Sequence, residues 1–301
     1  MTGRLTANAG DSAGKEWTVL SMLAWADAYM AERGIEEARL NAELLLAHVL
    51  QMPRLQLYLQ FDRPLIPEEL AAFKALFLRR LAREPLQYIL GETNFMGLTL
   101  RVDRRALIPR PETEHLVEAA LDYLKGRAAP AILDIGTGSG NVAIALGKSV
   151  PASRVVSIDC SSEALDLARE NAERNNAANV VFVLADVLQE PGIQGTFDLI
   201  VSNPPYVSLD DYNGLQPEVR EFEPRGAVTD GEDGYRFIRA IASQGSACLA
   251  PGGAIMMEIA YNQEAGARRM FEDAGCVEVG VLRDYAGLPR VVRGVRPGGF
   301  A

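Results

Sequence analysis

From residue 131 onward the chain alternates between short apolar segments and longer segments with apolar residues at helical spacing. Strands that alternate with helices in this way form a parallel sheet with helices on both of its faces. The predicted strands are 131–135, 154–158, 180–184, 197–202 and 253–259, with two last β segments at 277–282 and 290–295. The predicted helices are 141–148, 162–175, 235–248 and 263–274. The sequence therefore predicts an α/β fold with a mostly parallel, doubly wound sheet.

A glycine-rich loop follows the first predicted strand, with the sequence Asp-Ile-Gly-Thr-Gly-Ser-Gly at 134–140. Glycines at such a turn let the backbone bend tightly and let a ligand approach the N-terminus of the next helix. A dinucleotide fingerprint would need glycine at 141, where Asn stands, and a phosphate loop would need Gly-Lys-Ser/Thr. We predict that the loop binds a cofactor of another kind, through Gly136, Thr137, Gly138, Ser139 and Gly140.

Asp159 ends the second predicted strand, about 20 residues beyond the glycine loop, which is the separation at which a carboxylate reaches ribose hydroxyls in nucleoside-binding α/β folds. Asp186 and Val187 follow the third strand. An acidic loop residue is more often merely solvated, so Asp186 is the weaker of the two acidic candidates.

The fourth predicted strand leads into Asn203-Pro204-Pro205-Tyr206. The two prolines stiffen the chain, so the Asn203 side-chain carbonyl and the Pro204 carbonyl become fixed hydrogen-bond acceptors. Two fixed acceptors suit a planar NH2 group, and Tyr206 offers a flat face for stacking. Ligands of open α/β sheets bind where the strand order reverses. If strands one and four are neighbours there, the glycine loop and Asn203 share one crevice.

The first part of the chain has a different character. Residues 1–15 are polar and without periodicity, and we expect a loose leader. Apolar residues then recur at helical spacing, which predicts a helical domain over 16–84. The segment 85–108 alternates like a β-hairpin linker and leads into a second domain at 109–301. The cationic region from Arg79 to Arg105 is either solvated or a docking surface for a partner.

Composition limits the classes of function. The net charge of −10 argues against nucleic acid as the main partner, because phosphate binding needs clustered cations. Three scattered cysteines show no metal-ligand spacing and fit a reducing compartment. No apolar run is long enough for a membrane span, so we expect a cytoplasmic protein without a membrane partner and without a metal.

The glycine loop resembles the first motif of class I S-adenosylmethionine methyltransferases, and the whole chain resembles the HemK/PrmC family of N5-glutamine methyltransferases. The motifs that carry this resemblance are Leu86-Gln87-Tyr88-Ile89-Leu90-Gly91, Phe95-Met96-Gly97-Leu98, Leu107-Ile108-Pro109-Arg110-Pro111-Glu112-Thr113-Glu114, the loop 134–140 and Asn203-Pro204-Pro205-Tyr206.

The resemblance implies a class I methyltransferase fold, S-adenosylmethionine as cofactor, and class I peptide chain release factors as protein substrates. It implies methyl transfer to the glutamine of their Gly-Gly-Gln motif, with a catalytic role, largely one of positioning, for Asn203, Pro204, Pro205 and Tyr206. It also places Asp186 and Val187 beside the adenine, where some relatives have an aromatic residue in place of Val187. Asn203 is expected to contact the cofactor as well.

Two alternatives remain open. Adenine N6 methyltransferases of DNA or RNA share the Asn-Pro-Pro-Tyr motif and the glycine loop, although the acidic balance and the lack of a basic recognition domain count against them. A non-catalytic adaptor that keeps only the fold is disfavoured by the intact motifs. Methyl transfer to a release factor would separate all three.

Overall fold

The computed structural model describes residues 16–189 and 193–298, and the chain divides into two compact units after Leu90. The leader expected at 1–15 lies outside the described residues, as does the end of the tail at 299–301. No helix within the described ranges is long and apolar enough to cross a membrane.

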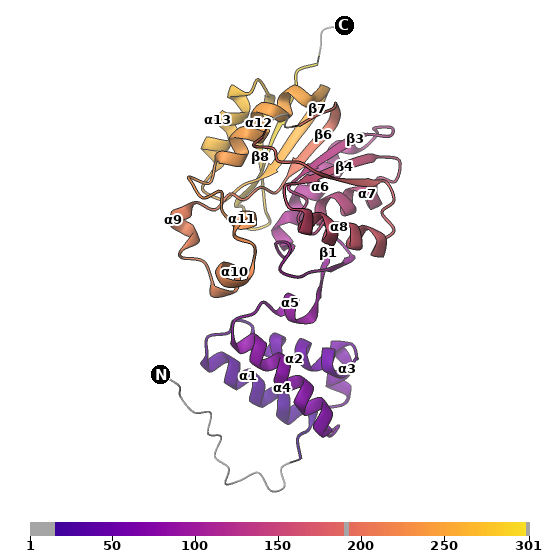
Figure 1. Cartoon of the computed structure of the whole chain (residues 1–301), viewed down its shortest axis with the longest axis vertical. Coiled ribbons are helices and arrows are strands. Elements are labelled where there is room, and N and C mark those ends of the chain that lie inside the picture. Colours follow the sequence, from indigo (N-terminus) through magenta and orange to yellow (C-terminus); the bar gives the residue numbers. More distant parts are fainter. Residues whose placement is uncertain (1–15, 190–192, 299–301) are drawn as a thin grey trace. The chain divides into compact units, whose positions relative to one another are not determined.

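The first unit is helical (Figure 1). Its helices are α1 (Val19–Glu32), α2 (Ala38–Val49), α3 (Arg54–Leu59), α4 (Pro67–Leu81) and α5 (Leu86–Leu90). Thr18 caps α1 by accepting a hydrogen bond from the Ser21 N–H, and Pro67 occupies the first turn of α4. The apolar faces of these helices enclose a core that includes Leu23, Phe73 and Phe77.

The segment 85–108 differs from the hairpin linker expected there. It starts with the short helix α5, and the hairpin itself is confined to β1 (Glu92–Phe95) and β2 (Leu98–Arg101), which pair antiparallel. Phe95 and Leu100 of the hairpin are buried in the core of the second unit. The hairpin is therefore packed as part of the second unit and is not a separate linker between the two units.

The second unit is built on a seven-stranded sheet with the order β5-β4-β3-β6-β7-β9-β8. The strands are β3 (Ala131–Ile135), β4 (Arg154–Asp159), β5 (Val180–Leu184), β6 (Phe197–Ser202), β7 (Leu249–Glu258), β8 (Val277–Arg283) and β9 (Pro289–Val295). The first five pair in parallel, and β9 pairs antiparallel with both β7 and β8. The predicted doubly wound, mostly parallel sheet is confirmed.

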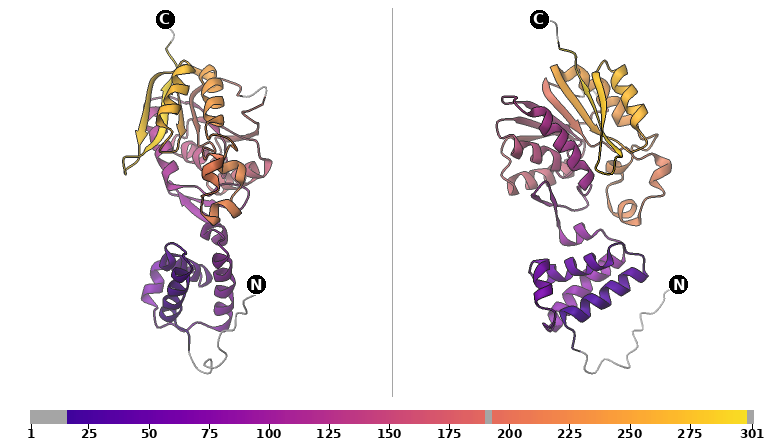
Figure 2. Two further views of the ribbon diagram at one scale, coloured as in Figure 1. Left: turned by 90° about the vertical axis from the view of Figure 1, so that its left-hand side faces the viewer. Right: turned by 180° about the vertical axis from the view of Figure 1, so that it is seen from behind.

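Helices cover both faces of this sheet (Figure 2). The helices packed on one face are α6 (Glu114–Leu124), α7 (Asn141–Ser149) and α8 (Ser162–Arg174), and those on the other face are α12 (Arg236–Cys248) and α13 (Glu264–Asp273). Ser161 caps α8 by accepting from the Ala164 N–H. The short 3-10 helix η1 (Pro111–Thr113) precedes α6.

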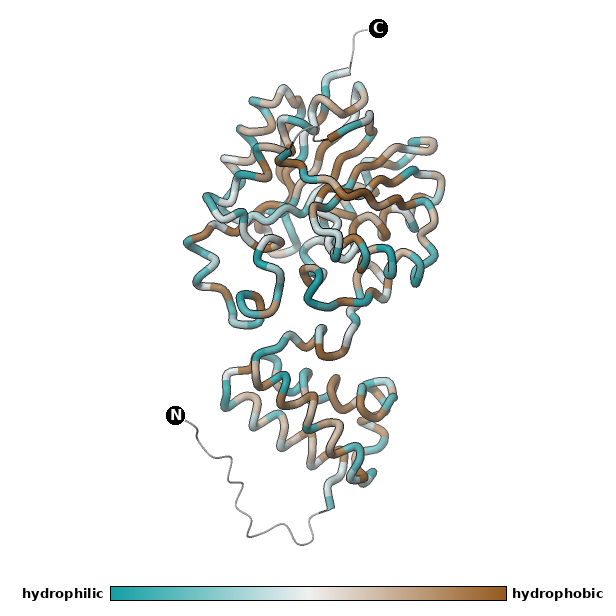
Figure 3. The backbone as a smooth tube through the Cα atoms, viewed as in Figure 1, coloured by the Kyte–Doolittle hydropathy of each residue, from teal (hydrophilic) through white to brown (hydrophobic). Residues whose placement is uncertain are grey.

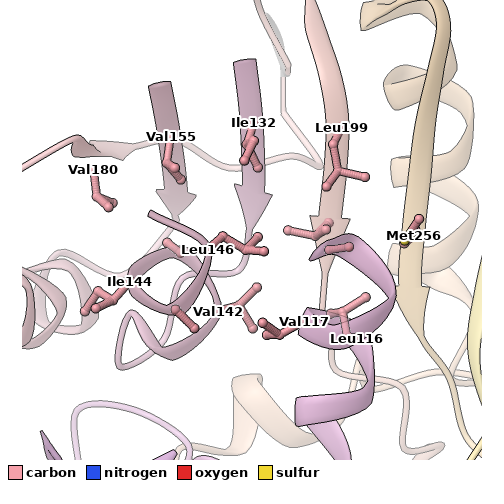
Figure 4. Packing of buried hydrophobic residues seen from close by; sticks show 14 of the residues in the cluster. Leu116, Val117, Ile132, Val142, Ile144, Leu146, Val155, Val180, Leu199 and Met256 are labelled. Carbon is pink, nitrogen blue, oxygen red and sulfur yellow. The ribbon is translucent and has the colours of Figure 1, made fainter. Parts of the chain in front are cut away.

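Successive strand residues point to opposite faces, so each strand supplies two cores. Ile132 of β3 packs with α6 and α7 (Figure 4), whereas the next residue, Leu133, packs with α12. The strands are accordingly apolar along most of their length, and polar residues gather in the loops and on the outer faces of the helices (Figure 3). This double burial explains why the strands read as continuous apolar runs.

The segment between β6 and α12 contains three short helices that the sequence reading did not predict, α9 (Leu209–Tyr212), α10 (Pro217–Phe222) and α11 (Arg225–Val228). Long-range contacts hold this insertion. The buried Glu223 carboxylate accepts a hydrogen bond from the Ile108 N–H at 3.1 Å and pairs with Arg110 at 2.5 Å. The insertion is thereby fixed to the segment that leads into η1.

Candidate active site

The strand order reverses between β3 and β6, which are parallel neighbours in the sheet. A cavity of about 250 Å³ opens at the carboxyl ends of these strands. Its lining includes Gly136 and Gly138 from the glycine loop and Asn203 and Pro204 from the segment after β6. The expected neighbourhood of strands one and four is therefore confirmed, and it brings both motifs to one crevice.

The glycine loop wraps the end of β3. Gly136, Gly138 and Gly140 all have positive φ, at 82°, 53° and 83°. A side chain at Gly138 would meet no atom within 4 Å, because this position faces the open cavity. Thr137 and Ser139 also line the cavity.

Gly140 differs from the other glycines of the loop. It lies outside the cavity lining as the described residues define it, and it caps the start of α7. A Cβ here would come within 2.9 Å of Ile144 and 3.1 Å of Ala168. Close packing of α7 on α8 is therefore a structural reason for glycine at this position, and the cofactor contact at Gly140 stays a prediction.

Asp159 supports the loop from the end of β4. One carboxylate oxygen accepts from the Gly138 N–H and the other from the Ser161 N–H, both at 2.9 Å. Each oxygen can accept a further hydrogen bond, and Asp159 lines the cavity. The arrangement suits two ribose hydroxyls.

Asp186 and Val187 form another part of the wall. The Asp186 carboxylate accepts from the Leu188 N–H and from the Gln189 side chain, each at 2.9 Å, so part of its acceptor capacity is used to shape its own loop. Val187 is buried and presents an aliphatic surface. Val187 therefore offers a planar ring an aliphatic contact, and Phe237 is an aromatic residue of the same cavity lining.

The Asn203 side chain is oriented by Thr113. Its amide nitrogen donates a 3.0 Å hydrogen bond to the Thr113 hydroxyl oxygen, and both residues line the cavity. With the nitrogen engaged, the amide oxygen is the atom left to accept from a ligand. Pro204 and Pro205 also line the cavity, as expected for a stiff acceptor segment.

Tyr206, whose stacking role stays a prediction, is anchored by its hydroxyl group. It is not part of the lining formed by the described residues, and its hydroxyl donates to Glu258 Oε1 at 3.0 Å. Gln263 fixes the backbone by donating from Nε2 to the Tyr206 carbonyl at 3.1 Å. Tyr206 thus connects the Asn-Pro-Pro segment to the end of β7.

Sequence reasoning missed Thr113, Glu258 and Glu223. Thr113 reads as an ordinary helix-start residue, and Glu258 is a lone acidic residue at the end of an apolar strand. Glu258 is 1% exposed, and burial raises the pKa of its carboxyl, opposed by the Thr113 and Tyr206 hydroxyls. Burial and the negative charge of Glu258 raise the pKa of Tyr206 as well. An acidic residue within an otherwise apolar predicted strand was the one available signal for Glu258.

Another buried acid lies under the glycine loop. Burial raises the pKa of Asp134 to about 7, although the Ser157 hydroxyl donates to it at 2.7 Å. The Thr137 hydroxyl in turn lies 2.5 Å from Ser157 Oγ. Because the Ser157 proton is given to Asp134, Ser157 accepts from Thr137, and this chain of hydrogen bonds ties the loop to the sheet.

The fold and this site define a class I methyltransferase, with a cofactor cavity at the switch point of a doubly wound sheet and an Asn-Pro-Pro-Tyr segment beside it. Residues 21–91 match the PrmC N-terminal domain family, and residues 113–214 match the methyltransferase small domain family.

The relatives narrow the class to a family. The chain is 46% identical to the release factor glutamine methyltransferase of Geobacter sulfurreducens over 92% of its own length and 96% of that protein. It is also 42% identical to the release factor glutamine methyltransferase of Chlorobaculum tepidum, over 92% of its own length and 96% of that protein. The chain belongs to the release factor glutamine methyltransferase family, and it is an enzyme that uses S-adenosylmethionine.

Among solved structures, this chain is similar to a release factor-specific protein-(glutamine-N5) methyltransferase from Alicyclobacillus acidocaldarius. The similar region covers 66% of this chain and 99% of the chain in that structure. The two are 28% identical, with a TM-score of 0.40.

Proposed function

We propose that this enzyme transfers a methyl group from S-adenosylmethionine to the side-chain nitrogen of the glutamine in the Gly-Gly-Gln motif of class I peptide chain release factors. One observation carries the chemistry, which is that the glycine loop and the Asn203 amide line a single cavity. A cofactor held by the loop and a substrate amide held by Asn203 would therefore meet. Family membership supports the choice of glutamine.

The residues present fit the cofactor. Gly138 leaves open space in the cavity where any side chain would project, Asp159 offers carboxylate oxygens for ribose hydroxyls, and Val187 offers an apolar wall for adenine. S-adenosylmethionine supplies a methyl group on a positively charged sulfur. The residues around Asn203 must then position the glutamine amide that accepts this methyl group.

A glutamine amide is a poor nucleophile because its nitrogen lone pair is delocalised into the carbonyl. The Asn203 Oδ1 atom and the Pro204 carbonyl oxygen accept its two N–H groups, so the nitrogen is held and its more tetrahedral geometry is favoured during attack. Positioning and fixed dipoles then supply much of the rate. As the nitrogen bonds the methyl group, the methyl–sulfur bond breaks and the sulfur leaves neutral. The nitrogen is strongly acidic only after this step, so its surplus proton can pass to solvent and a strong base is not required beforehand.

The helical unit is proposed to help dock the release factor. One glutamine side chain offers little contact area, so affinity must come from a wider surface. On α3 the residues Leu55 and Leu59 are 76% and 83% exposed. Such apolar exposure on a short helix suits contact with a protein partner. With a translation factor as substrate, we propose that the enzyme acts in the cytoplasm.

The direct test incubates purified enzyme, release factor and S-adenosylmethionine and follows the Gly-Gly-Gln peptide by mass spectrometry. A mass increase of one methyl group on the glutamine is the expected result, and the Asn203→Ala variant should show it far more slowly. Methylation of DNA adenine with none on the release factor would contradict the proposal. An enzyme that binds S-adenosylmethionine and methylates neither substrate would contradict it as well.

A further inference from the structure

Three segments that lie far apart in the sequence form one part of the cavity wall. They are 108–113, 203–207 and 223–228. Each contributes a proline to the cavity lining, and these are Pro109, Pro205 and Pro224. A proline fixes its own φ and restricts the conformation of the residue before it. Each segment is therefore stiff where it faces the cavity.

Hydrogen bonds join these three segments end to end. Asn203 Nδ2 donates to Thr113 Oγ1 at 3.0 Å, which joins the second segment to the first. The Val207 N–H donates to the Val228 carbonyl at 3.2 Å, which joins the second segment to the third. Glu223 makes the remaining connection, from the third segment back to the first. The three segments and these connections form a closed course of chain, which we call the ring.

Glu223 closes the ring with two hydrogen bonds. Its Oε2 atom accepts from the Ile108 N–H at 3.1 Å, and its Oε1 atom accepts from the Arg110 guanidinium at 2.5 Å. The Glu223 side chain is 1% exposed, and a carboxylate so deeply buried needs such partners. Glu223 lies outside the cavity lining of the described residues, whereas Ile108 and Arg110 belong to it. Glu223 therefore acts on the cavity by holding these two residues.

The ring limits what can stand beside a glutamine that reaches Asn203. Asn203 is itself part of the ring, so a substrate side chain must lie against the ring to place its NH2 group at the Asn203 oxygen. Stiff, connected segments do not move aside for an additional atom without a cost. A glycine next to the glutamine has no Cβ and lets the substrate backbone approach closely.

We propose that Glu223 is a positioning residue that closes the ring, and that the closed ring selects a glutamine preceded by glycine. This inference rests on the proposed function, because it assigns part of the substrate preference to the same cavity. A side chain on the residue before the glutamine would collide with the closed ring. Breaking the ring at Glu223 should let the segments 108–113 and 223–228 separate and accommodate that side chain.

The first experiment compares release factor that carries Gly-Gly-Gln with a release factor variant that carries Gly-Ala-Gln, in separate reactions with one enzyme preparation. The original enzyme should favour Gly-Gly-Gln in kcat/KM by about ten- to a hundredfold, the range over which a binding pocket discriminates one additional carbon. In Glu223→Ala this ratio should fall to about threefold or less. A loss of folded enzyme leaves the ratio unchanged, because both substrates meet the same preparation.

Asp198→Ala is the matched control for Glu223→Ala. The Asp198 carboxylate also accepts from a backbone N–H, that of Ala131 at 2.8 Å, and it pairs with Arg127 at 3.5 Å. It lies near the start of β6, at the end of the strand away from the cavity, so the ratio should keep its original value. A ratio near one in the original enzyme, a ratio unchanged in Glu223→Ala, or an equal fall in the control would overturn the proposal.

A double-mutant cycle with milder variants keeps the test valid if Glu223→Ala fails to fold. Glu223→Gln keeps an oxygen for the Ile108 N–H but loses the ion pair, so the ratio should fall by about threefold. Arg110→Met removes the cation of the same pair and should lower the ratio to a similar extent. The double variant should lower it no further than by about another factor of 1.5. Reductions that multiply would show that the two residues act separately and would overturn the role of their pair in closing the ring.

Hydrogen exchange of backbone amides separates this inference from the proposed function, because it needs no substrate. In Glu223→Gln, exchange should become faster in 108–113 and in 223–228 together, and it should stay unchanged there in Asp198→Ala. Unchanged exchange in either segment of Glu223→Gln would overturn the closing role of Glu223 even in an enzyme that methylates release factor. Faster exchange in both segments, in an enzyme that methylates neither form of release factor, would uphold that role and contradict the proposed function.

Discussion

The backbone N–H of Gly138 donates a 2.9 Å hydrogen bond to the Asp159 carboxylate, which joins the loop after β3 to the end of β4. This contact holds the loop in the left-handed conformation that Gly138 adopts at φ 53°. The same position opens onto the cavity without any atom within 4 Å of a side chain placed there. Position 138 therefore combines a left-handed backbone, which favours glycine, with open space in the cavity beside it.

We predict that Gly138→Val abolishes S-adenosylmethionine binding, because the branched side chain would project into the cavity. The strained backbone should also cost about 1–3 kcal/mol of stability. Gly126→Val is the matched control, since Gly126 has positive φ at 80° and open space around it but lies outside the cavity lining of the described residues. Calorimetry should show normal affinity in the control, and unchanged affinity in a folded Gly138→Val enzyme would refute the placement of the cofactor.

Asn203→Ala should lower kcat by on the order of 10²-fold or more while changing the Kd for S-adenosylmethionine little. The reason is that the Asn203 oxygen gains importance when the substrate nitrogen rehybridises, which is a transition-state effect. Single-turnover kinetics at saturating cofactor would measure it. Near-normal turnover would remove Asn203 from the mechanism.

Sequence reasoning predicted the sheet well because its strands are buried on both faces and its helices carry a clear apolar period. Segment 180–184 coincides with β5, and 131–135 with β3. The insertion between β6 and α12 escaped because its helices are too short to show a period. It depends on the Glu223 contacts with Ile108 and Arg110, which are 115 and 113 residues away in sequence.

The site was predicted in part for a similar reason. Glycines and prolines constrain the backbone locally, so Gly138 and Asn203 could be placed at the ends of strands from the sequence alone. Thr113 contacts Asn203 and Glu258 contacts Tyr206 across the fold, and the one local signal was the acidic residue within an apolar strand. For Tyr206 the sequence suggested only a stacking role for the aromatic ring. The hydrogen bond from its hydroxyl to the buried Glu258 carboxylate could not be predicted from the local sequence.

Asp134→Asn should change how stability depends on pH. A carboxyl whose pKa is raised on folding stabilises the protein when protonated, below its unfolded pKa, and this contribution is lost as the pH rises through the folded pKa of about 7. Asparagine keeps an oxygen to accept from Ser157 and does not ionise. The Tm of the variant relative to the original enzyme should therefore rise between about pH 4 and pH 7 and level off above. A Tm difference that is constant over this range would contradict the raised pKa.

The helical unit gives the last prediction, which concerns affinity for the release factor. Leu55 and Leu59 on α3 are exposed, whereas Arg80 of the cationic region is buried and donates to Asn41 at 2.8 Å. Docking by this unit should therefore depend on the apolar side chains more than on Arg80.

We expect Leu55→Asp with Leu59→Asp, in the full chain, to raise the KM for intact release factor by about tenfold, the equivalent of about 1.4 kcal/mol of lost contact. kcat and the Kd for S-adenosylmethionine should stay unchanged, because both depend on the second unit. A short Gly-Gly-Gln peptide, which lacks the remaining surface of the release factor, serves as the internal control and should be methylated equally by both enzymes. An unchanged KM for intact release factor would assign these leucines no part in docking, and an equal loss on the peptide would indicate damage to the catalytic unit instead.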